Sequence, residues 1–250
     1  MMNNTNSQGM RRKISTNLKT MSSDVSTYDI ELLLNRPIPL KQVRVRFNRQ
    51  DFDAKLPSLK SNRELILKEW NTRLESNPSL YNGKKFRLAK VTQLSDSTVE
   101  LGIGLSDYAS YLGTNRNTEP DFIHLLLEEG FQNYQDRKAL FANVFGNAAL
   151  ILTKDDCIPF VKRSSKTAEF AGWYDLPGGH PEPSRVNEDM TVFDNNSDLK
   201  LEDSIRNEIF FSILDEVHCE LNIPLEKLGE PLLMGIESAH SSYGKPSAIL

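Results

Sequence analysis

The pattern of apolar and polar positions changes at about residue 28. Residues 1–26 are rich in Asn, Ser and Thr and hold few large apolar side chains, which is typical of a disordered tail. Beyond this point, apolar runs at 30–34 and 43–47 predict two strands, the second by clean alternation. The segment Pro37-Ile38-Pro39 between them marks a turn or an edge strand, because proline does not donate a backbone hydrogen bond.

The next segment alternates between helical and strand-like patterns. We expect Ser61 to cap a helix that ends near Ser76, before Asn77-Pro78. Its expected apolar side consists of Leu65, Leu67, Trp70 and Leu74. Further strands are expected at 86–88, near 91 and at 99–105, and helices from Asp107 and over 123–131. Together these elements predict an N-terminal α+β region over residues 28–136.

The second half opens with a continuous apolar run. Residues 144–152 predict a core strand, and Asp155-Asp156 a turn that leads into a second strand at 158–163, forming a hairpin. The polar insert at 184–200 is expected to be a surface loop.

A long helix is predicted over residues 201–221. Its buried stripe is expected to consist of Ile205, Ile209, Ile213 and Val217. A strand follows at 232–236, and another begins at 247–250. A sheet that lacked further strands beyond this point would expose an apolar edge.

The other edge of this helix carries candidate chemistry. Glu208, Ser212, Glu216 and Glu220 follow one another at four-residue steps, so they lie along one edge. Like charges at this spacing repel by roughly 0.2–0.5 kcal/mol per pair, and a divalent cation between them would remove that cost. The pair Gly178-Gly179 upstream can adopt positive φ and leaves backbone groups open to a phosphate or a metal. The combination predicts a metal–diphosphate site.

Composition and charge exclude several classes of protein. The net charge of −4 gives no basic face for nucleic acid. The two cysteines, Cys157 and Cys219, do not have a metal-finger spacing and fit a reducing compartment. There is neither a membrane-length apolar run nor a secretory segment. Although the tail is basic, it lacks the apolar face of a mitochondrial presequence, so a cytoplasmic location is expected.

The helix and the glycine pair together resemble the Nudix box. Residues 215–223 match the second half of the box, Arg-Glu-U-x-Glu-Glu-x-Gly-U with U aliphatic. Asp215 replaces the Arg, Cys219 the first of the paired Glu, and Asn222 the Gly. Asn tolerates the left-handed conformation at a helix C-terminus, whereas a thiol is a poor ligand for Mg²⁺. The interval from Gly179 to Glu216 is also much longer than in the standard box.

The resemblance extends to one branch of this family, the UDP-sugar diphosphatases. It is carried by the segments 177–183, 84–88, 104–108, 112–115 and 231–236. It implies an α+β fold with a Nudix α/β/α sandwich at residues 137–250, whose C-terminal strands are missing. The preceding region, 28–136, would contribute to nucleotide binding. The implied activity is Mg²⁺-dependent hydrolysis of UDP-glucose and UDP-galactose, small-molecule substrates, to UMP and a sugar 1-phosphate.

The resemblance also assigns roles to particular residues. It implies that Glu216 and Glu220 are the catalytic metal ligands, with the Gly178 carbonyl as a candidate third. The implied substrate-binding residues are Tyr81, Tyr108, Arg163, Ala168, Asp175, His180 and Glu182. Tyr81 would stack on the uracil ring, and Arg163 would clamp a phosphate through two hydrogen bonds. Either His180 or Glu182 would be the general base.

Three alternatives compete with this interpretation. A nucleotide-sugar binding protein without catalysis is favoured by Cys219 and by the early end of the sequence. A Nudix hydrolase of another nucleoside diphosphate derivative, such as ADP-ribose or CoA, would share the same site. A zinc deaminase is suggested by His180-Pro181-Glu182, but the Pro-Cys-x-x-Cys motif that would complete its metal site is missing. The preferred sugar and the oligomeric state are not fixed by the sequence.

Overall fold

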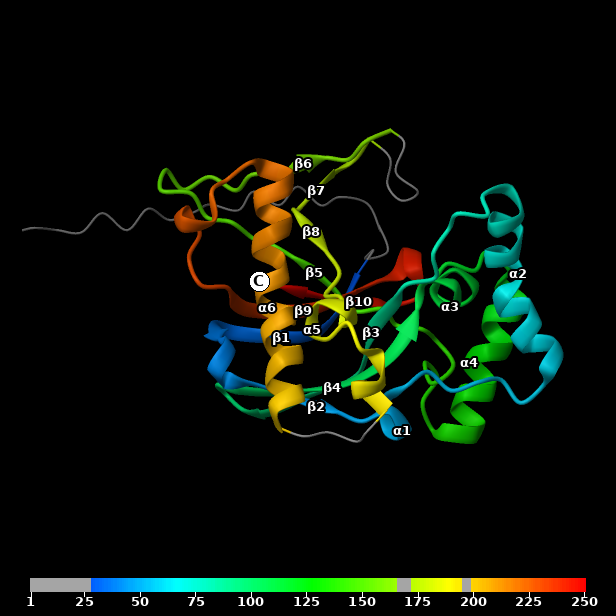
Figure 1. Ribbon diagram of the computed structural model, residues 1–250. Helices are drawn as coiled ribbons and strands as arrows, with labels where there is room; N and C mark the ends of the chain where they lie inside the picture. The colour runs from blue at the N-terminus through cyan, green and yellow to red at the C-terminus, as the bar shows by residue number, and fades with distance from the viewer. Residues whose placement is uncertain (1–27, 166–171, 195–198) are drawn as a thin grey trace, which may run out of the picture.

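A computed structural model describes residues 28–165, 172–194 and 199–250 (Figure 1). The tail predicted at 1–26 lies outside these ranges. The described residues form a five-stranded sheet and a three-stranded sheet together with helices, which confirms the α+β class. The strands of the five-stranded sheet, in spatial order, are β1 (Tyr28–Pro39), β9 (Leu232–Ala239), β10 (Lys245–Ile249), β5 (Gly146–Ala148) and β8 (Gly178–Gly179).

The remaining elements surround this sheet. The three-stranded sheet has the order β2 (Val43–Phe47), β4 (Thr98–Asp107) and β3 (Lys84–Ser95), and a small separate ribbon pairs β6 (Val161–Lys162) with β7 (Tyr174–Asp175). The α-helices are α1 (Arg49–Phe52), α2 (Lys60–Ser76), α3 (Tyr108–Gly113), α4 (Pro120–Tyr134), α5 (Pro183–Val186) and α6 (Leu199–Leu221). Short 3₁₀ turns are η1 (Leu40–Gln42), η2 (Met190–Asp194), η3 (Leu225–Lys227) and η4 (His240–Ser242).

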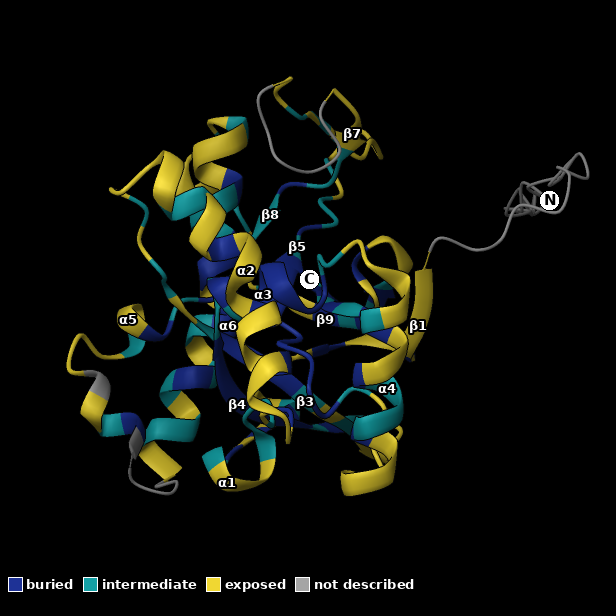
Figure 2. Cartoon of the chain, turned by 90° about the vertical axis from the view of Figure 1, so that its right-hand side faces the viewer, coloured by how far each residue is buried: buried dark blue, intermediate teal, exposed yellow. Residues whose placement is uncertain are grey.

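Helix α6 joins the two main sheets. It contacts β2 of the three-stranded sheet as well as β5 and β8 of the five-stranded sheet, and α2, α3 and α4 gather to the right of the sheets in Figure 1. Figure 2 shows buried residues on α6, β3, β4 and β9, and largely exposed residues on the outward faces of α2 and α4. None of the helices in the described residues is long and apolar enough to span a membrane.

The two regions predicted from the sequence share one sheet and one core. β1, from the first region, pairs antiparallel with β9, from the second, and Tyr28 lies opposite Ala239. The largest buried apolar cluster likewise draws on both, for example Phe47 on β2 and Ile209 on α6. A site built on this sheet therefore receives side chains from both halves of the chain.

The strand predicted at 247–250 corresponds to β10 and does not lie at an edge. It pairs antiparallel with β9 and parallel with β5, so the edge strands of the described sheet are β1 and β8. The backbone N–H of Leu250 donates to the carbonyl of Ala148 at 2.9 Å. The expected apolar edge at this strand is therefore not found.

The helix near Ser61 was predicted correctly, but its cap and half of its buried face were not. α2 begins at Lys60, so Ser61 lies inside the helix, and the N-cap residue Leu59 makes no side-chain cap. Of the expected apolar side, Trp70 is buried and Leu74 packs against its cluster. Leu65 is 44% and Leu67 is 41% exposed, and Ile66 is buried in their place. The reason lies in α3, where Gly113 packs so closely that an added Cβ would lie 1.7 Å from the carbonyl oxygen of Ile66.

The hairpin predicted between 144–152 and 158–163 is not formed in the described structure. Only residues 146–148 of the apolar run are a strand, and β6 pairs with β7 instead. The donors of the run bond elsewhere, because the N–H of Ala149 donates to Pro177 and that of Leu150 donates to Leu250, both at 2.8 Å. The turn at Asp155-Asp156 is present, but it connects segments that do not pair as strands.

The insert predicted at 184–200 as a surface loop contains a core residue. It forms the last residues of α5 and then η2, apart from residues 195–198, which lie outside the described ranges. Phe193 in η2 is fully buried and packs edge-on against Phe47 and Phe86, with ring centroids 5.6 and 6.1 Å apart. A single phenylalanine in a polar segment carries no periodic signal, so the sequence did not reveal this anchor.

Helix α6 follows the prediction closely. All four residues of the expected stripe are buried, together with Phe210 and Ser212. The helix ends at Leu221, and Asn222 adopts the left-handed conformation with φ of 54°. This confirms that Asn222 replaces the terminal glycine of the Nudix box for a conformational reason.

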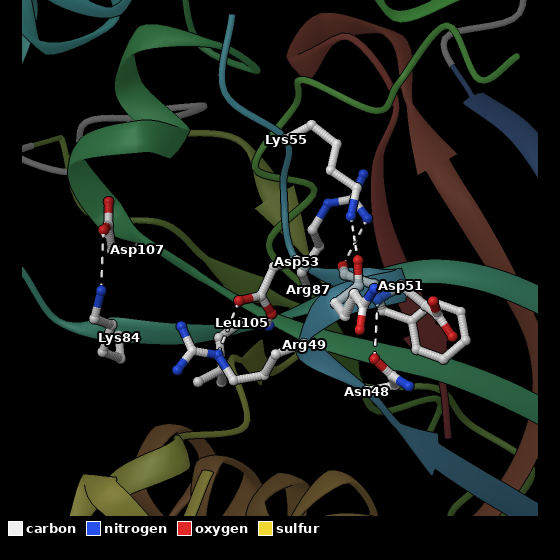
Figure 3. Close-up of polar contacts among 11 residues, drawn as sticks. Asn48, Arg49, Asp51, Asp53, Lys55, Lys84, Arg87, Leu105 and Asp107 are labelled. Atoms are coloured by element: carbon white, nitrogen blue, oxygen red, sulfur yellow. Dashed lines mark hydrogen bonds and ion pairs between the residues drawn. The ribbon is translucent and has the colours of Figure 1, made fainter. Parts of the chain in front are cut away.

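Buried Arg87 ties α1 and the 138–141 loop to β3. Its guanidinium donates to the carbonyls of Phe52, Phe141 and Lys138 at 2.9, 3.0 and 2.9 Å. Figure 3 shows Arg87 beside α1. Burial lowers the pKa of Arg87 to about 10, so it stays charged at neutral pH. Asp53 adds a second link, since its carboxylate accepts from the N–H of Leu105 at 2.7 Å. The Arg87 bonds fix β3, the strand that carries Lys85, relative to α1 and the 138–141 loop.

Candidate functional site

A cavity of about 590 Å³ lies beside the Gly178–Gly179 strand. Its walls come from the C-terminal turn of α6, from the β6–β7 ribbon and from the strands β1, β9 and β10. Among its polar lining residues are Tyr28, Arg163, Asp175, His180, Glu220, Glu237 and Lys245. The cavity thus contains both cationic and anionic side chains, as a charged substrate with polar groups requires.

The two predicted metal ligands lie against the glycine pair. The Glu220 carboxylate accepts a hydrogen bond from the N–H of Gly178 at 3.2 Å. Gly179 faces Glu216 so closely that an added Cβ would lie 2.1 Å from its Oε1. Neither glycine has positive φ, and both form β8, which pairs with β5. The expected positive-φ turn was therefore wrong. Instead, Gly179 leaves space for the Glu216 carboxylate, and Gly178 leaves space for the backbone carbonyl of Asn147.

Glu216 has the electrostatics of a cation ligand. Within the described residues its carboxylate makes no hydrogen bond or ion pair. Partial burial and the charge of Glu220 raise its pKa, which shows that the ionised form is poorly compensated. No group of three or more His, Cys, Asp or Glu side chains that would hold a metal occurs in the described part of the chain. Two carboxylates nevertheless fit Mg²⁺, which keeps several waters and binds substrate oxygens.

Cations lie close to the other acidic side chains near the site. The N–H of Glu182 donates to the Glu208 carboxylate at 3.0 Å, and the Glu182 side chain forms an ion pair with Lys85. Arg185 lies 3.8 Å from Glu208 and forms an ion pair with Asp215. Arg185 also attracts Glu216 but forms no ion pair with it, and burial raises the pKa of both Glu208 and Glu216. Among the described residues, Glu216 thus differs from these carboxylates in lacking an ion-pair partner.

Asn147 holds the glycine strand in place, and the sequence did not point to it. Its side-chain oxygen accepts from the N–H of Gly179 at 3.3 Å. Its amide nitrogen donates to Ser212 at 2.9 Å and to the carbonyl of Ile209 at 3.2 Å. The one signal was a polar residue within an apolar run, which in a buried strand requires internal partners. Asn147 therefore fixes β8 relative to the carboxylates of α6.

Arg163 and Asp175 form the wall contributed by the β6–β7 ribbon. The guanidinium of Arg163 lies 3.3 Å from the Asp175 carboxylate, and both residues line the cavity. The structure thus brings these two predicted residues together with Glu220 and His180. Cys219 on α6 is exposed and does not line the cavity, so the thiol lies on the outer side of the helix.

The other predicted contacts lie elsewhere. Tyr81 is 83% exposed, and Tyr108 packs against Trp70 and Tyr111; neither lines the cavity. Glu182 is also outside the cavity lining, next to Lys85. Ala168 lies outside the described residues.

His180 lines the cavity and is held in the neutral form. Burial, followed by the charges of Lys245 and Lys85, lowers its pKa well below 6.5. Solvent reaches part of the ring through the cavity, but protein surrounds most of it. In the described residues it forms no hydrogen bond, so its ring nitrogens remain available to a ligand or a water molecule.

This burial predicts a pH-dependent stability. Above pH about 6.5 the ring is neutral in both the folded and the unfolded state. As the pH falls below this value, the unfolded chain takes up a proton that the folded protein does not, and the free energy of unfolding decreases. His180→Gln should reduce this decrease, measured as the difference in Tm between pH 7.5 and 5.5. An equal difference in both proteins would contradict the burial of a neutral ring; His124→Gln serves as the control.

No protein-family model matches the chain. It is 34% identical over 227 residues to a uridine diphosphate glucose pyrophosphatase of Bos taurus, a match that covers 88% of this chain and 75% of the relative. It is 32% identical over 227 residues to the Homo sapiens protein of that name, covering 88% and 72%. It is also 34% identical over 232 residues to Nudix hydrolase 9 of Arabidopsis thaliana, covering 86% and 71%.

Proposed function

The chain belongs to the Nudix hydrolase family, and from this premise we propose that it hydrolyses the diphosphate bond of UDP-sugars, UDP-glucose and UDP-galactose among them, to UMP and a sugar 1-phosphate. The observation that carries the proposal is the pair Glu216 and Glu220 packed against Gly178–Gly179 beside the cavity. Two relatives whose names state UDP-glucose pyrophosphatase support the substrate.

Glu216 and Glu220 would hold Mg²⁺ through carboxylate oxygens. When bound, the ion supplies neutralisation of the diphosphate charge and acidification of a water molecule. Glu216 forms no ion pair in the described residues, and burial together with the charge of Glu220 raises its pKa despite the attraction of Arg185. Both observations fit this role, because a cation would stabilise the ionised form. Asn147 and Gly179 keep the space in front of Glu216 open.

Other residues around the cavity are assigned to phosphate binding and to orientation of the attacking water. Arg163 and Lys245 offer positive charge to the phosphate oxygens, and the bond to Asp175 fixes the direction of the Arg163 guanidinium. Of the two candidate bases, His180 lines the cavity in its neutral form, whereas Glu182 is paired with Lys85. We therefore assign the orientation of the attacking water to His180. Stacking of uracil on Tyr81 stays a prediction.

The direct test is incubation of the purified chain with UDP-glucose, with and without Mg²⁺, followed by chromatography of the nucleotides. We expect UMP only with Mg²⁺, and its loss on addition of a chelator. A parallel incubation with ADP-ribose would yield AMP if the substrate class were different. A rise in Tm with UDP-glucose, without any UMP, would contradict hydrolysis and favour a binding protein.

A further inference from the structure

Glu237 is a carboxylate of the cavity that has no role in the proposed hydrolysis. It lies on β9, in the centre of the five-stranded sheet, and its side chain is partly buried. No described residue forms a hydrogen bond or an ion pair with it. A partly buried carboxylate that accepts no hydrogen bond from the protein costs folding free energy, so a ligand that donates hydrogen bonds to it would complement it.

The sheet register places Glu237 within a polar floor of the cavity. Ser247 lies opposite Glu237, while Tyr28 and Lys245 lie opposite Ala239, two residues further along β9. Since side chains two residues apart share a face, all four polar residues face the cavity, which they line together. Burial, despite the opposing charge of Lys245, raises the pKa of Glu237, with a further contribution from Asp175.

The charges around this floor restrict what Glu237 binds. A phosphate is excluded, because two anions would repel. A metal ion at Glu237 itself is disfavoured, because the positive charge of Lys245 already acts on this carboxylate. The ligand that remains is a neutral group that donates hydrogen bonds, because the oxygens of an ionised carboxylate accept hydrogen bonds and do not donate them. The donors next to the diphosphate of a nucleotide sugar are the hydroxyl groups of its two sugars.

We infer that Glu237 binds hydroxyl groups of the ribose or the hexose of the substrate and thereby selects a sugar-bearing diphosphate. This inference rests on the proposed function. Ser247 and Tyr28 add hydroxyl groups on the same floor, so a polyhydroxylated ring finds donors and acceptors side by side. The Glu237 carboxylate lies on the sheet. Its negative charge contrasts with the positive charges of Arg163 and Lys245, which are proposed to face the diphosphate.

The test is Glu237→Gln, which keeps the size of the side chain but removes its charge and one acceptor. Isothermal titration without Mg²⁺, where no turnover is expected, should show about 10- to 100-fold weaker binding of UDP-glucose, the loss expected for a hydrogen bond to a charged group. The Tm should rise, because the variant removes a partly buried charge whose desolvation the attraction of Lys245 does not fully offset. Glu230→Gln, at an exposed carboxylate before β9, is the matched control and should leave both quantities unchanged.

The outcomes separate the possibilities. Weaker binding of UDP-glucose with unchanged binding of UDP assigns Glu237 to the hexose, and weaker binding of both assigns it to the ribose; each supports the inference. Unchanged binding of UDP-glucose overturns it, and so does a fall in Tm, which would show a structural role for the carboxylate. If the unsubstituted chain binds no UDP-glucose, the proposed function itself fails, and this result is independent of the variant.

Discussion

Replacing Glu220 with Gln is expected to lower Mg²⁺-dependent hydrolysis of UDP-glucose by more than about 100-fold. Loss of a residue that merely supports a metal ligand costs about 10- to 100-fold, and loss of a ligand should exceed this. Under the proposed mechanism, in which Glu216 and Glu220 would hold the cation, the neutral amide is a weaker ligand than the carboxylate. The measurement is the initial rate of UMP formation over a range of Mg²⁺ concentrations.

The stability of this variant separates catalysis from structure. Glu220 is exposed, and in the described residues its carboxylate accepts one hydrogen bond, from the N–H of Gly178, which the amide oxygen of Gln can still accept. The Tm should therefore change little. Glu226→Gln, at an exposed residue of η3, is the control and should retain full activity. A strong fall in Tm for Glu220→Gln would identify the residue as structural.

Gly179→Ala should abolish activity while leaving the fold largely intact. The new methyl group would lie 2.1 Å from Oε1 and 2.5 Å from Cδ of Glu216, so the carboxylate has to move. It is the end of a flexible side chain, and φ at Gly179 is not positive, so the stability cost should stay below about 1 kcal/mol. UMP formation should fall by at least about 100-fold, since displacing the carboxylate is equivalent to losing a ligand.

Gly178→Ala provides the contrast. There the methyl group would lie 2.5 Å from the backbone carbonyl of Asn147, which cannot move without disturbing the pairing of β5 and β8. This variant should lose about 1–3 kcal/mol of stability, the usual cost of overpacking. Urea unfolding of both variants measures the difference. Equal destabilisation by the two alanines would contradict the distinction between a flexible and a rigid neighbour.

The sequence predicted elements whose periodicity is long and regular. Helix α6 has a stripe of four apolar residues at four-residue steps, so its burial, its end at Leu221 and the φ of Asn222 followed from the pattern. The first half of the α2 face was misjudged, because adjacent apolar residues at 65–67 leave two phases open. Phe193 and the pairing of β6 with β7 depend on contacts between distant segments, which a local pattern does not encode.

The same limit applies to the candidate site. Glu216 and Glu220 stand one helical turn apart, so the sequence alone brought them together. Glu237 and Lys245 belong to strands whose neighbours are chosen by the fold, and Tyr28 reaches the cavity from the opposite end of the chain. Gly178 and Gly179 were singled out correctly as candidates but for the wrong reason, since their role is to leave room and not to reverse the chain.

The position of β10 has a consequence for how the protein reaches its folded state. β10 is the sole link between the β1–β9 pair and the β5–β8 pair in the described sheet. β1 cannot pair with β9 until β9 has been synthesised, some two hundred residues later in the chain. Contacts between such distant segments are slow to form, because the intervening chain loses entropy before they stabilise it. On the ribosome, helix α6 would thus emerge before the sheet it packs against can close, leaving its apolar stripe exposed to binding by a chaperone.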